Sequence, residues 1–391
     1  MKILHCTHSC DPRGGGPWEA IVQFSKEHIQ SGHEVLAVTC DDPMAPWCQE
    51  SQIPTIGLGP ANGYGYTSKL ENWLRENAGA FDCAIVHGLW QYHGFIAEKV
   101  FPKIGLPYFV FPHGMLDPWF KKQYFLKHLK KALYWKFIEH RVLSHADSVL
   151  FTCEEEMQLA RDTFYPYKCN ARIVPLGIEA LSEGYPEIGS AFFKKYPNLE
   201  NKNFLLYLSR VHLKKGLDMM LNAFLKLEEC PPHLVIAGPV DCHLFEKELK
   251  AIENKISARF PEWICVWAGM IRGDLKWDAL SVADAFVLPS HQENFGIAVI
   301  EALAVGTPVL ITKRVNIFNE ISAAEAGLVS DDTLEGVLNM LKEWMGLDHI
   351  SKTQYASKAK KCFYKNYEIS QAAENFLNVI NEEISKRSLV A

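Results

Sequence analysis

The sequence lacks a hydrophobic run long enough to cross a bilayer. Its longest nearly uncharged stretch, residues 297–312, contains Glu301 and is shorter than the roughly 20 apolar residues that a membrane-spanning helix needs. An excess of basic residues is also missing, because 40 Lys and Arg stand against 46 Asp and Glu and leave a net charge of −6. We therefore expect no nucleic-acid partner, and an anionic ligand has to be bound by local basic groups.

Several ligand motifs are absent as well. The chain has no G-x-G-x-x-G fingerprint, no G-x-x-x-x-G-K-[ST] loop and no D-x-D triplet. The first two absences disfavour a dinucleotide oxidoreductase and a P-loop ATPase. His5, Cys6, His8 and Cys10 form a candidate metal cluster, but no second Cys/His pair follows at the spacing of a zinc site, so we expect no metal.

The eleven cysteines are odd in number and scattered along the chain. Many lie inside apolar, strand-like runs, which is typical of buried free thiols in a reducing compartment. The first residues contain too short an apolar stretch for a signal peptide. These observations together predict a cytoplasmic protein.

Short apolar runs alternate with helix-length segments along the chain. They lie at 2–7, 34–39, 83–87, 108–112 and 148–152, and again at 204–209, 233–238, 264–269, 285–289 and 308–312. This alternation predicts parallel sheets covered by helices on both faces, and 391 residues suit two such domains. A polar stretch from about 175 to 203 is the expected linker. Because doubly wound sheets bind ligands beyond the carboxyl ends of their strands, we expect a cleft between the domains.

Two loops at predicted strand ends in the first half carry candidate ligand contacts. Gly14, Gly15 and Gly16 follow the first strand, so their amides can approach an anion at the start of the next helix. A plain glycine-rich turn explains them equally well. His113 follows the strand at 108–112 and is placed either to project into the cleft or merely to cap a turn.

Arg210 and Lys215 form a similar candidate in the second half. They lie between a predicted strand and the next helix, where a guanidinium fork and an ammonium point charge suit a phosphate group. Solvated surface cations are the alternative, because such pairs are common.

Residues 291–306 hold a loop followed by a helix that is apolar on every side except at Glu301. An unpaired buried carboxylate costs several kcal/mol, so Glu301 needs a partner. Glu293 lies on the loop, and the helix N-terminus at Gly296 and Ile297 can receive phosphate oxygens. The two glutamates would then bind hydroxyl groups on either side of a diphosphate, with Glu301 on the ribose. The alternative is a structural Lys or Arg that pairs with Glu301.

In combination these motifs resemble the signature of retaining glycosyltransferases of family 4, the glycosyl transferase group 1 enzymes. The resemblance covers nearly the whole chain in the expected order. It rests on the run Glu293-Asn-Phe-Gly-Ile-Ala-Val-Ile-Glu301, on Arg210-x4-Lys215-Gly216, on Pro112-His113-Gly114 and on the Gly14–Gly16 loop.

The resemblance implies an α/β protein with the GT-B fold, in which two Rossmann-like doubly wound parallel-sheet domains face a central cleft. Residues 1–178 would bind the acceptor and residues 179–372 the nucleotide-sugar, while a helix at about 373–391 packs back on the first domain. The catalytic residues implied are His113, Glu293, Arg210 and Lys215. The donor-binding residues implied are Gly15, Gly16, Arg210, Lys215, Met270, Ile271, Glu293, Asn294, Phe295, Gly296, Ile297 and Glu301.

The implied reaction moves a hexose from a nucleoside-diphosphate sugar, with UDP-glucose as the preferred donor, to a saccharide or lipid-linked saccharide in polysaccharide biosynthesis. Arg210, Lys215 and helix amides would stabilise the leaving diphosphate, so we expect neither a metal nor a cofactor. A sugar-nucleotide epimerase and a non-enzymatic sugar-binding protein of two domains are the alternatives.

Residues 119–137 combine lysines with aromatic side chains, and two interpretations stay open. The helix either docks on anionic lipid at the inner face of the membrane, where it presents a lipid-linked acceptor, or packs its apolar stripe on its own sheet. The stripe comprises Phe120, Tyr124, Leu126, Leu129, Leu133 and Phe137.

Overall fold

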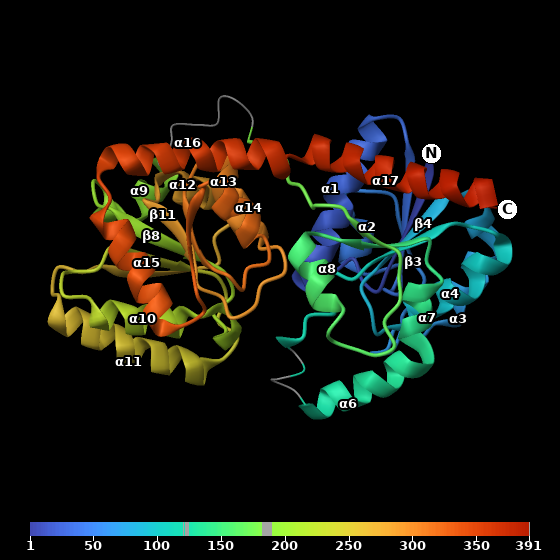
Figure 1. Cartoon of the computed structure of the whole chain (residues 1–391), viewed down its shortest axis with the longest axis horizontal. Helices are drawn as coiled ribbons and strands as arrows, with labels where there is room; N and C mark the ends of the chain where they lie inside the picture. The colour runs from blue at the N-terminus through green and yellow to red at the C-terminus, as the bar shows by residue number, and fades with distance from the viewer. Residues whose placement is uncertain (120, 122–124, 182–189, 391) are drawn as a thin grey trace. The chain divides into compact units, whose positions relative to one another are not determined.

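The computed structural model describes the chain except residues 120, 122–124, 182–189 and 391, and divides it into two compact units (Figure 1). Unit 1 comprises Met1–Glu179 and Glu368–Ala391, and unit 2 comprises Ala180–Tyr367. Each unit is built on one parallel sheet with helices on both faces, which confirms the predicted fold class.

The sheet of unit 1 has the strand order β3-β2-β1-β4-β5-β6-β7, and every pair of neighbours is parallel. Its order reverses between β1 and β4, so the loops after these two strands open at a switch point where doubly wound sheets bind ligands. The strands are β1 (Lys2–Thr7), β2 (Glu34–Thr39), β3 (Thr55–Gly57), β4 (Cys83–His87), β5 (Tyr108–Phe111), β6 (Ser148–Phe151) and β7 (Ala171–Ile173).

The helices of unit 1 cover both faces of this sheet. Helix α17 packs on α1, where the ring of Phe376 lies 5.1 Å from that of Phe24, and α4 packs on α3 and α7. The helices are α1 (Gly16–Gln30), α2 (Pro46–Gln49), α3 (Ser68–Asn77), α4 (Tyr92–Ile104), α6 (Phe125–Tyr134), α7 (His140–Ser144), α8 (Glu154–Ala160) and α17 (Ile369–Val390). Short turns of helix lie at η1 (Pro12–Gly14), η2 (Ala78–Ala80) and η3 (Trp135–Glu139).

The sheet of unit 2 repeats this plan with the parallel order β10-β9-β8-β11-β12-β13, and its switch point lies between β8 and β11. The strands are β8 (Phe204–Leu208), β9 (His233–Ala237), β10 (Cys265–Gly269), β11 (Ala285–Leu288), β12 (Val309–Thr312) and β13 (Gly327–Ser330). All of β8 and β11 is buried, as expected for central strands between two helix layers.

In unit 2, α10 packs on α11 and α15, while α13 packs on α12 and α16 (Figure 1). Capping residues mark several helix ends. Thr333 and Asp348 accept hydrogen bonds from backbone amides at the starts of α15 and α16. Gly306, with φ +84°, ends α13. The helices are α9 (Ser190–Lys195), α10 (Leu217–Lys226), α11 (His243–Arg259), α12 (Asp274–Val282), α13 (Ile297–Val305), α14 (Phe318–Ala323), α15 (Leu334–Gly346) and α16 (His349–Asn366), with turns η4 (Pro197–Leu199) and η5 (Leu213–Lys215).

Candidate functional site

The candidate donor site of unit 2 lies where β8 and β11 end side by side. The loop after β8 contacts the loop after β11, because His291 N donates to Lys214 O at 2.8 Å. Gly216 is required here: its φ is +69°, and a Cβ would overlap the carbonyl oxygen of Pro289. The two loops therefore form one structural unit at the switch point.

Lys215 and Glu293, predicted on separate loops, form an ion pair in which Lys215 Nζ donates to Glu293 Oε2. Burial raises the pKa of the Glu293 carboxyl, but Lys215 beside it outweighs burial and leaves that pKa below its usual range. The main chain of Glu293 is fixed by Arg314 O at 2.8 Å and Asn316 N at 3.0 Å. The fold thus presents a charged, rigidly held pair.

Arg210 lies at the other side of the same loop and does not join this pair. Its guanidinium is 64% exposed and lies 3.2 Å from Asp241, in a surface pair of the kind that contributes little to stability. A ligand phosphate can therefore compete with Asp241 for the guanidinium.

The N-terminus of α13 follows Glu293 directly, as predicted. Gly296 caps the helix with φ +71°, and no side chain caps it, while the amide of Val299 already donates to Gly296 O at 2.8 Å. The first two amides of the helix therefore stay available to an anion. Phe295 is buried and its ring packs edge-on against Tyr367 at 5.7 Å. Asn294 accepts a bond from Asn316 Nδ2 at 3.2 Å.

Glu301 pairs with a lysine, as the alternative interpretation of the sequence expected, although the sequence did not show which one. Lys276 Nζ of α12 donates to Glu301 Oε1 at 2.6 Å, with both side chains largely buried. On the loop between β10 and α12, Met270 is exposed and Ile271 is buried. That Glu301 also binds a ribose stays a prediction.

The glycine loop of unit 1 lies at the corresponding switch point. Helix α1 begins at Gly16, and Gly15, with φ +84°, is its N-cap residue. A Cβ at Gly14 or Gly15 would meet no atom within 4 Å, so packing does not explain these glycines. The loop leaves room for a ligand beside the α1 N-terminus.

His113 follows β5 with φ +51° and contacts His87, which in turn contacts His5, and the sequence analysis connected neither histidine with it. Its Nε2 lies 3.0 Å from His87 Nδ1, and His87 Nε2 lies 2.9 Å from His5 Nδ1. The main chain of the next residue is held by a hydrogen bond, because Gly114 N donates to the buried carboxylate of Glu156 at 2.6 Å. Glu156 also accepts from the amide and hydroxyl of Thr152. The hydrogen bonds of Glu156 therefore fix the turn that contains His113.

Comparison with known proteins decides the family. Residues 190–361 match the family described as glycosyl transferases group 1, and residues 15–177 match the glycosyl transferase 4-like domain. The chain belongs to the group 1 glycosyltransferases.

Among relatives of this glycosyltransferase, alpha-monoglucosyldiacylglycerol synthase of Streptococcus pneumoniae is 28% identical over 326 residues, which are 79% of this chain and 70% of the relative. An uncharacterized glycosyltransferase of Methanocaldococcus jannaschii is 28% identical over 189 residues, which are 46% of this chain and 45% of that one. The chain thus spans about half the length of the first curated relatives it matches.

Among solved structures, HepE of Anabaena in complex with UDP and glucose has a TM-score of 0.72. Its sequence is 15% identical, and the match covers 98% of this chain and 100% of HepE. This likeness shows that the glycosyltransferase has the GT-B fold.

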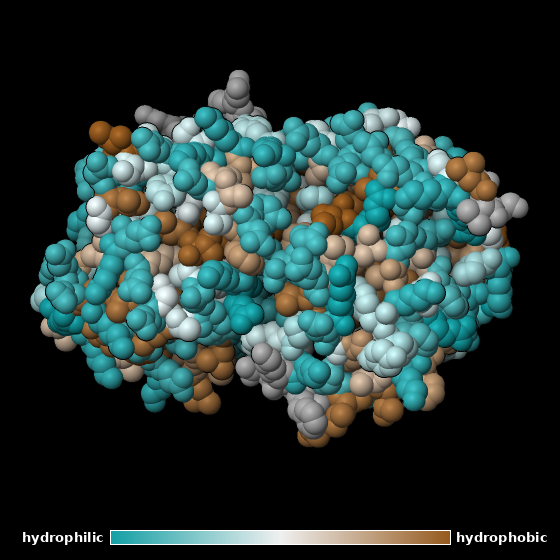
Figure 2. Space-filling view, in the orientation of Figure 1, coloured by the Kyte–Doolittle hydropathy of each residue, from teal (hydrophilic) through white to brown (hydrophobic). Residues whose placement is uncertain are grey.

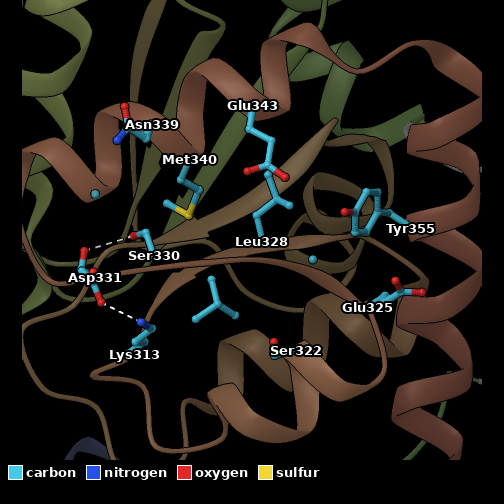
Figure 3. A pocket seen from close by; sticks show the side chains of 13 residues that line it. Lys313, Ser322, Glu325, Leu328, Ser330, Asp331, Asn339, Met340, Glu343 and Tyr355 are labelled. Carbon is cyan, nitrogen blue, oxygen red and sulfur yellow. Dashed lines mark hydrogen bonds and ion pairs between the residues drawn. The ribbon is translucent and has the colours of Figure 1, made fainter.

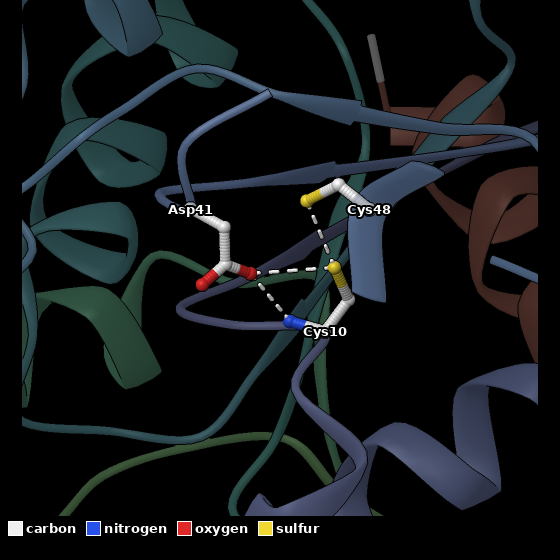
Figure 4. Close-up of side chains that lie close together, drawn as sticks. All are labelled: Cys10, Asp41 and Cys48. Carbon is white, nitrogen blue, oxygen red and sulfur yellow. Dashed lines mark hydrogen bonds between the residues drawn. The ribbon is translucent and has the colours of Figure 1, made fainter. Parts of the chain in front are cut away.

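The metal cluster weighed from the sequence does not assemble as a unit. His5 bonds to His87, whereas Cys10 Sγ lies 3.3 Å from both Cys48 Sγ and Asp41 Oδ2 (Figure 4). Cys10, Asp41 and Cys48 are the described residues whose ligand atoms lie close enough to hold a metal ion. Burial raises the pKa of both thiols, which disfavours the thiolate form that binds metals.

A hollow of about 430 Å³ opens between β13, α14 and α15 of unit 2 (Figure 3). Lys313 and Asp331 form a 2.8 Å ion pair at its edge. None of the predicted donor-binding residues lines this hollow.

Helix α6 exposes the apolar stripe that the sequence predicted, so the alternative in which the stripe packs on its own sheet is wrong for its described residues. Trp135 instead anchors the helix, since its side chain is buried and donates to Pro166 O at 2.7 Å. Figure 2 shows hydrophobic side chains along the outer edge of α6. The exposed fractions are 80% for Leu126, 48% for Leu129, 64% for Leu133 and 67% for Phe137.

Two members of the predicted stripe, Phe120 and Tyr124, lie outside the described residues. Among the residues that are described, no helix is both long enough and apolar enough to span a membrane.

Proposed function

We propose that this glycosyltransferase moves a hexose from a UDP-sugar, with UDP-glucose as the first choice, to a saccharide or lipid-linked saccharide in polysaccharide biosynthesis. One observation carries the proposal: the Lys215–Glu293 pair lies directly before the uncapped N-terminus of α13, at the switch point of unit 2. Cations and helix amides there suit a diphosphate, and a carboxylate suits the hydroxyl groups of a sugar. The HepE structures, which contain UDP and glucose or UDP-glucose, support the choice of donor.

The chemistry follows from where charge develops. As the anomeric bond breaks, the departing nucleoside diphosphate gains negative charge, which Lys215, Arg210 and the α13 amides stabilise. Diphosphate oxygens also take over Lys215 from Glu293, so donor binding frees the carboxylate for the sugar. In this proposal the two side-chain cations replace a metal, and the anomeric configuration is retained.

The acceptor proposal rests on α6. Exposed leucines beside the exposed Lys127, Lys130 and Lys136 suit an anionic lipid surface, where apolar side chains enter the interface and lysines meet headgroups. The relative named alpha-monoglucosyldiacylglycerol synthase bears a lipid in its name, which supports a lipid-linked acceptor here.

The deciding experiment measures nucleotide release from a panel of UDP- and GDP-sugars, with and without glycolipid and oligosaccharide acceptors. We expect UDP release from UDP-glucose that rises at least tenfold when the correct acceptor is added. The Lys215→Ala variant serves as a control in which UDP release should be at least tenfold slower. Conversion of the donor into another UDP-sugar without any acceptor would instead establish the epimerase alternative.

A further inference from the structure

Three histidine rings form a continuous chain from the core of unit 1 to His113. His5 on β1 is fully buried, His87 at the end of β4 is nearly so, and His113 follows β5. The two ring-to-ring contacts, at 2.9 and 3.0 Å, use both nitrogens of His87. Phe111 stacks on His87 and on His113, with centroids 6.0 and 4.8 Å away, which fixes the ring planes.

Each ring in this chain carries one N–H. Burial lowers the pKa of His5 and of His113 to about 3, and it holds the pKa of His87 well below its usual value. Neutral imidazole donates from one nitrogen and accepts at the other. Two hydrogen bonds in series therefore both run in the same direction along the chain, either from His5 toward His113 or from His113 toward His5. In the first case His5 Nε2 is unprotonated and His113 Nδ1 carries a proton. In the second case His5 Nε2 carries a proton and His113 Nδ1 is unprotonated.

Two neighbouring buried histidines show which ring nitrogen carries the proton when the other has no partner. His93 Nε2 contacts His87 O at 2.8 Å, and His28 Nε2 contacts Ala373 O at 3.2 Å. A carbonyl accepts only, so in both neutral rings Nε2 carries the proton and Nδ1 is a bare lone pair. Both of these Nδ1 atoms are buried without a partner.

At His5 the nitrogen without a partner is Nε2, which is also buried. It is either an unprotonated nitrogen or an unpaired N–H. In His93 and His28 the unpartnered nitrogen is a lone pair, and orphaned buried N–H groups are rare in proteins. The same preference at His5 puts its proton on Nδ1, which donates to His87 Nε2. His87 Nδ1 then donates to His113 Nε2, and the proton of His113 lies on Nδ1.

We propose that His5 and His87 are positioning residues that hold His113 as an Nδ1–H hydrogen-bond donor toward the substrate. His113 is half-buried, and its hydrogen bond among the described residues uses Nε2, so Nδ1 is the nitrogen left for a ligand. His113 then donates to an oxygen of the sugar or of the departing phosphate and does not act as a base. The assigned tautomer stands by itself, whereas its role toward the substrate rests on the proposed function.

The tautomer is measured directly by long-range ¹H–¹⁵N correlation spectra of the ¹⁵N-histidine-labelled full chain at pH 7, in which bare and protonated ring nitrogens resonate far apart. The His113 signals are assigned by their loss in His113→Asn. We expect a protonated Nδ1 and a bare Nε2 at His113. A proton on Nε2 of His113 overturns the proposal, and this readout needs no transferase activity.

Kinetics test the role. Asn and Asp both tolerate the positive φ of residue 113 and place a polar atom where Nδ1 lies, but only the Asn amide donates. We expect kcat of His113→Asn to exceed that of His113→Asp by on the order of tenfold. His87→Phe should lower kcat with little change in KM, while the control His28→Phe, which removes a buried histidine outside the chain of rings, keeps kcat. Equal kcat for the Asn and Asp variants, or an unchanged kcat in His87→Phe, contradicts the donor role.

Discussion

Lys276 Nζ lies 2.6 Å from Glu301 Oε1, and this contact explains how a carboxylate persists inside an otherwise apolar helix. The pair joins α12 to α13. A carboxylate offers about four lone-pair sites on its two oxygens, so the contact with Lys276 does not prevent a ribose hydroxyl from donating to Glu301 as well. The structural and the ligand-binding interpretations of Glu301 are therefore compatible.

We predict that Glu301→Gln raises the KM for the donor about tenfold with little change in kcat, because a ribose contact acts equally in ground and transition states. Glu293→Gln should lower kcat at least tenfold instead. Steady-state kinetics with the best UDP-sugar measures both. Lys276→Met is the matched control: if it raises KM as much as Glu301→Gln does, Glu301 acts only through its ion pair.

Removal of either cation near the diphosphate should slow transfer. We predict that Arg210→Ala and Lys215→Ala each lower kcat at least tenfold, since each removes a charge that stabilises the leaving group. Lys313→Ala provides the control, because Lys313 is an exposed lysine of the same unit that pairs with Asp331 outside the predicted donor site. Activity should also be unchanged by EDTA, and loss of activity that magnesium or manganese restores would refute the metal-free mechanism.

Much of the fold was predictable from apolar runs, because central parallel strands are buried on both faces and read as continuous hydrophobic segments. All ten predicted strands appear within one residue of their expected bounds. The strands that were missed are β3 and β7, three-residue edge strands without an apolar run, and β13, whose sequence GLVS holds only two large apolar residues.

Most candidate site residues were proposed from their places after strands. Lys215, Glu293 and His113 lie on loops at carboxyl ends of strands, as the sequence predicted, and their roles toward a ligand stay predictions. Lys276 could not be found this way, since it lies on a helix and meets Glu301 only through helix packing. His87 did carry a signal, because His87-Gly88 ends a strand just as His113-Gly114 follows one.

Acid should destabilise the fold through its buried histidines. Their folded-state pKa values lie below the ordinary 6.5, at about 3 for His5 and His113 and about 4 for His28 and His93. The unfolded chain therefore binds protons between pH 6.5 and 4 that the folded chain does not, so stability falls as pH falls through that window. Each such histidine contributes up to about 1.4 kcal/mol per pH unit.

Urea unfolding at pH 7, 6 and 5 measures this dependence. The slope of unfolding free energy against pH should shrink by about one proton in His28→Phe. An equal slope in the variant and the wild type would show that His28 is not held neutral by the fold.

The lipid-docking prediction can now be made sharper than the sequence allowed. Lys131 is unsuitable as a probe, because its ammonium lies 4.5 Å from the ring centroid of Trp90 and its pKa is lowered by burial. Lys127, Lys130 and Lys136 are exposed, so glutamate substitutions there reverse surface charge without disturbing the core. Each well-placed cation adds about 1 kcal/mol of attraction to anionic lipid at low salt.

We predict that the wild type sediments with vesicles containing phosphatidylglycerol at low salt and stays in the supernatant with purely phosphatidylcholine vesicles. The triple variant Lys127→Glu, Lys130→Glu, Lys136→Glu should lose sedimentation, and Leu126→Ser with Leu133→Ser should weaken it, because the leucines supply the apolar contact. A charge-matched control, Lys226→Glu on α10 with Lys247→Glu and Lys255→Glu on α11, replaces three other exposed lysines. It separates an effect of α6 from one of net charge, and it should sediment normally. If the wild type stays in the supernatant with both kinds of vesicle, or if the control fails as the α6 variant does, α6 is not a lipid-docking helix. A saccharide acceptor free of lipid would then be the better proposal.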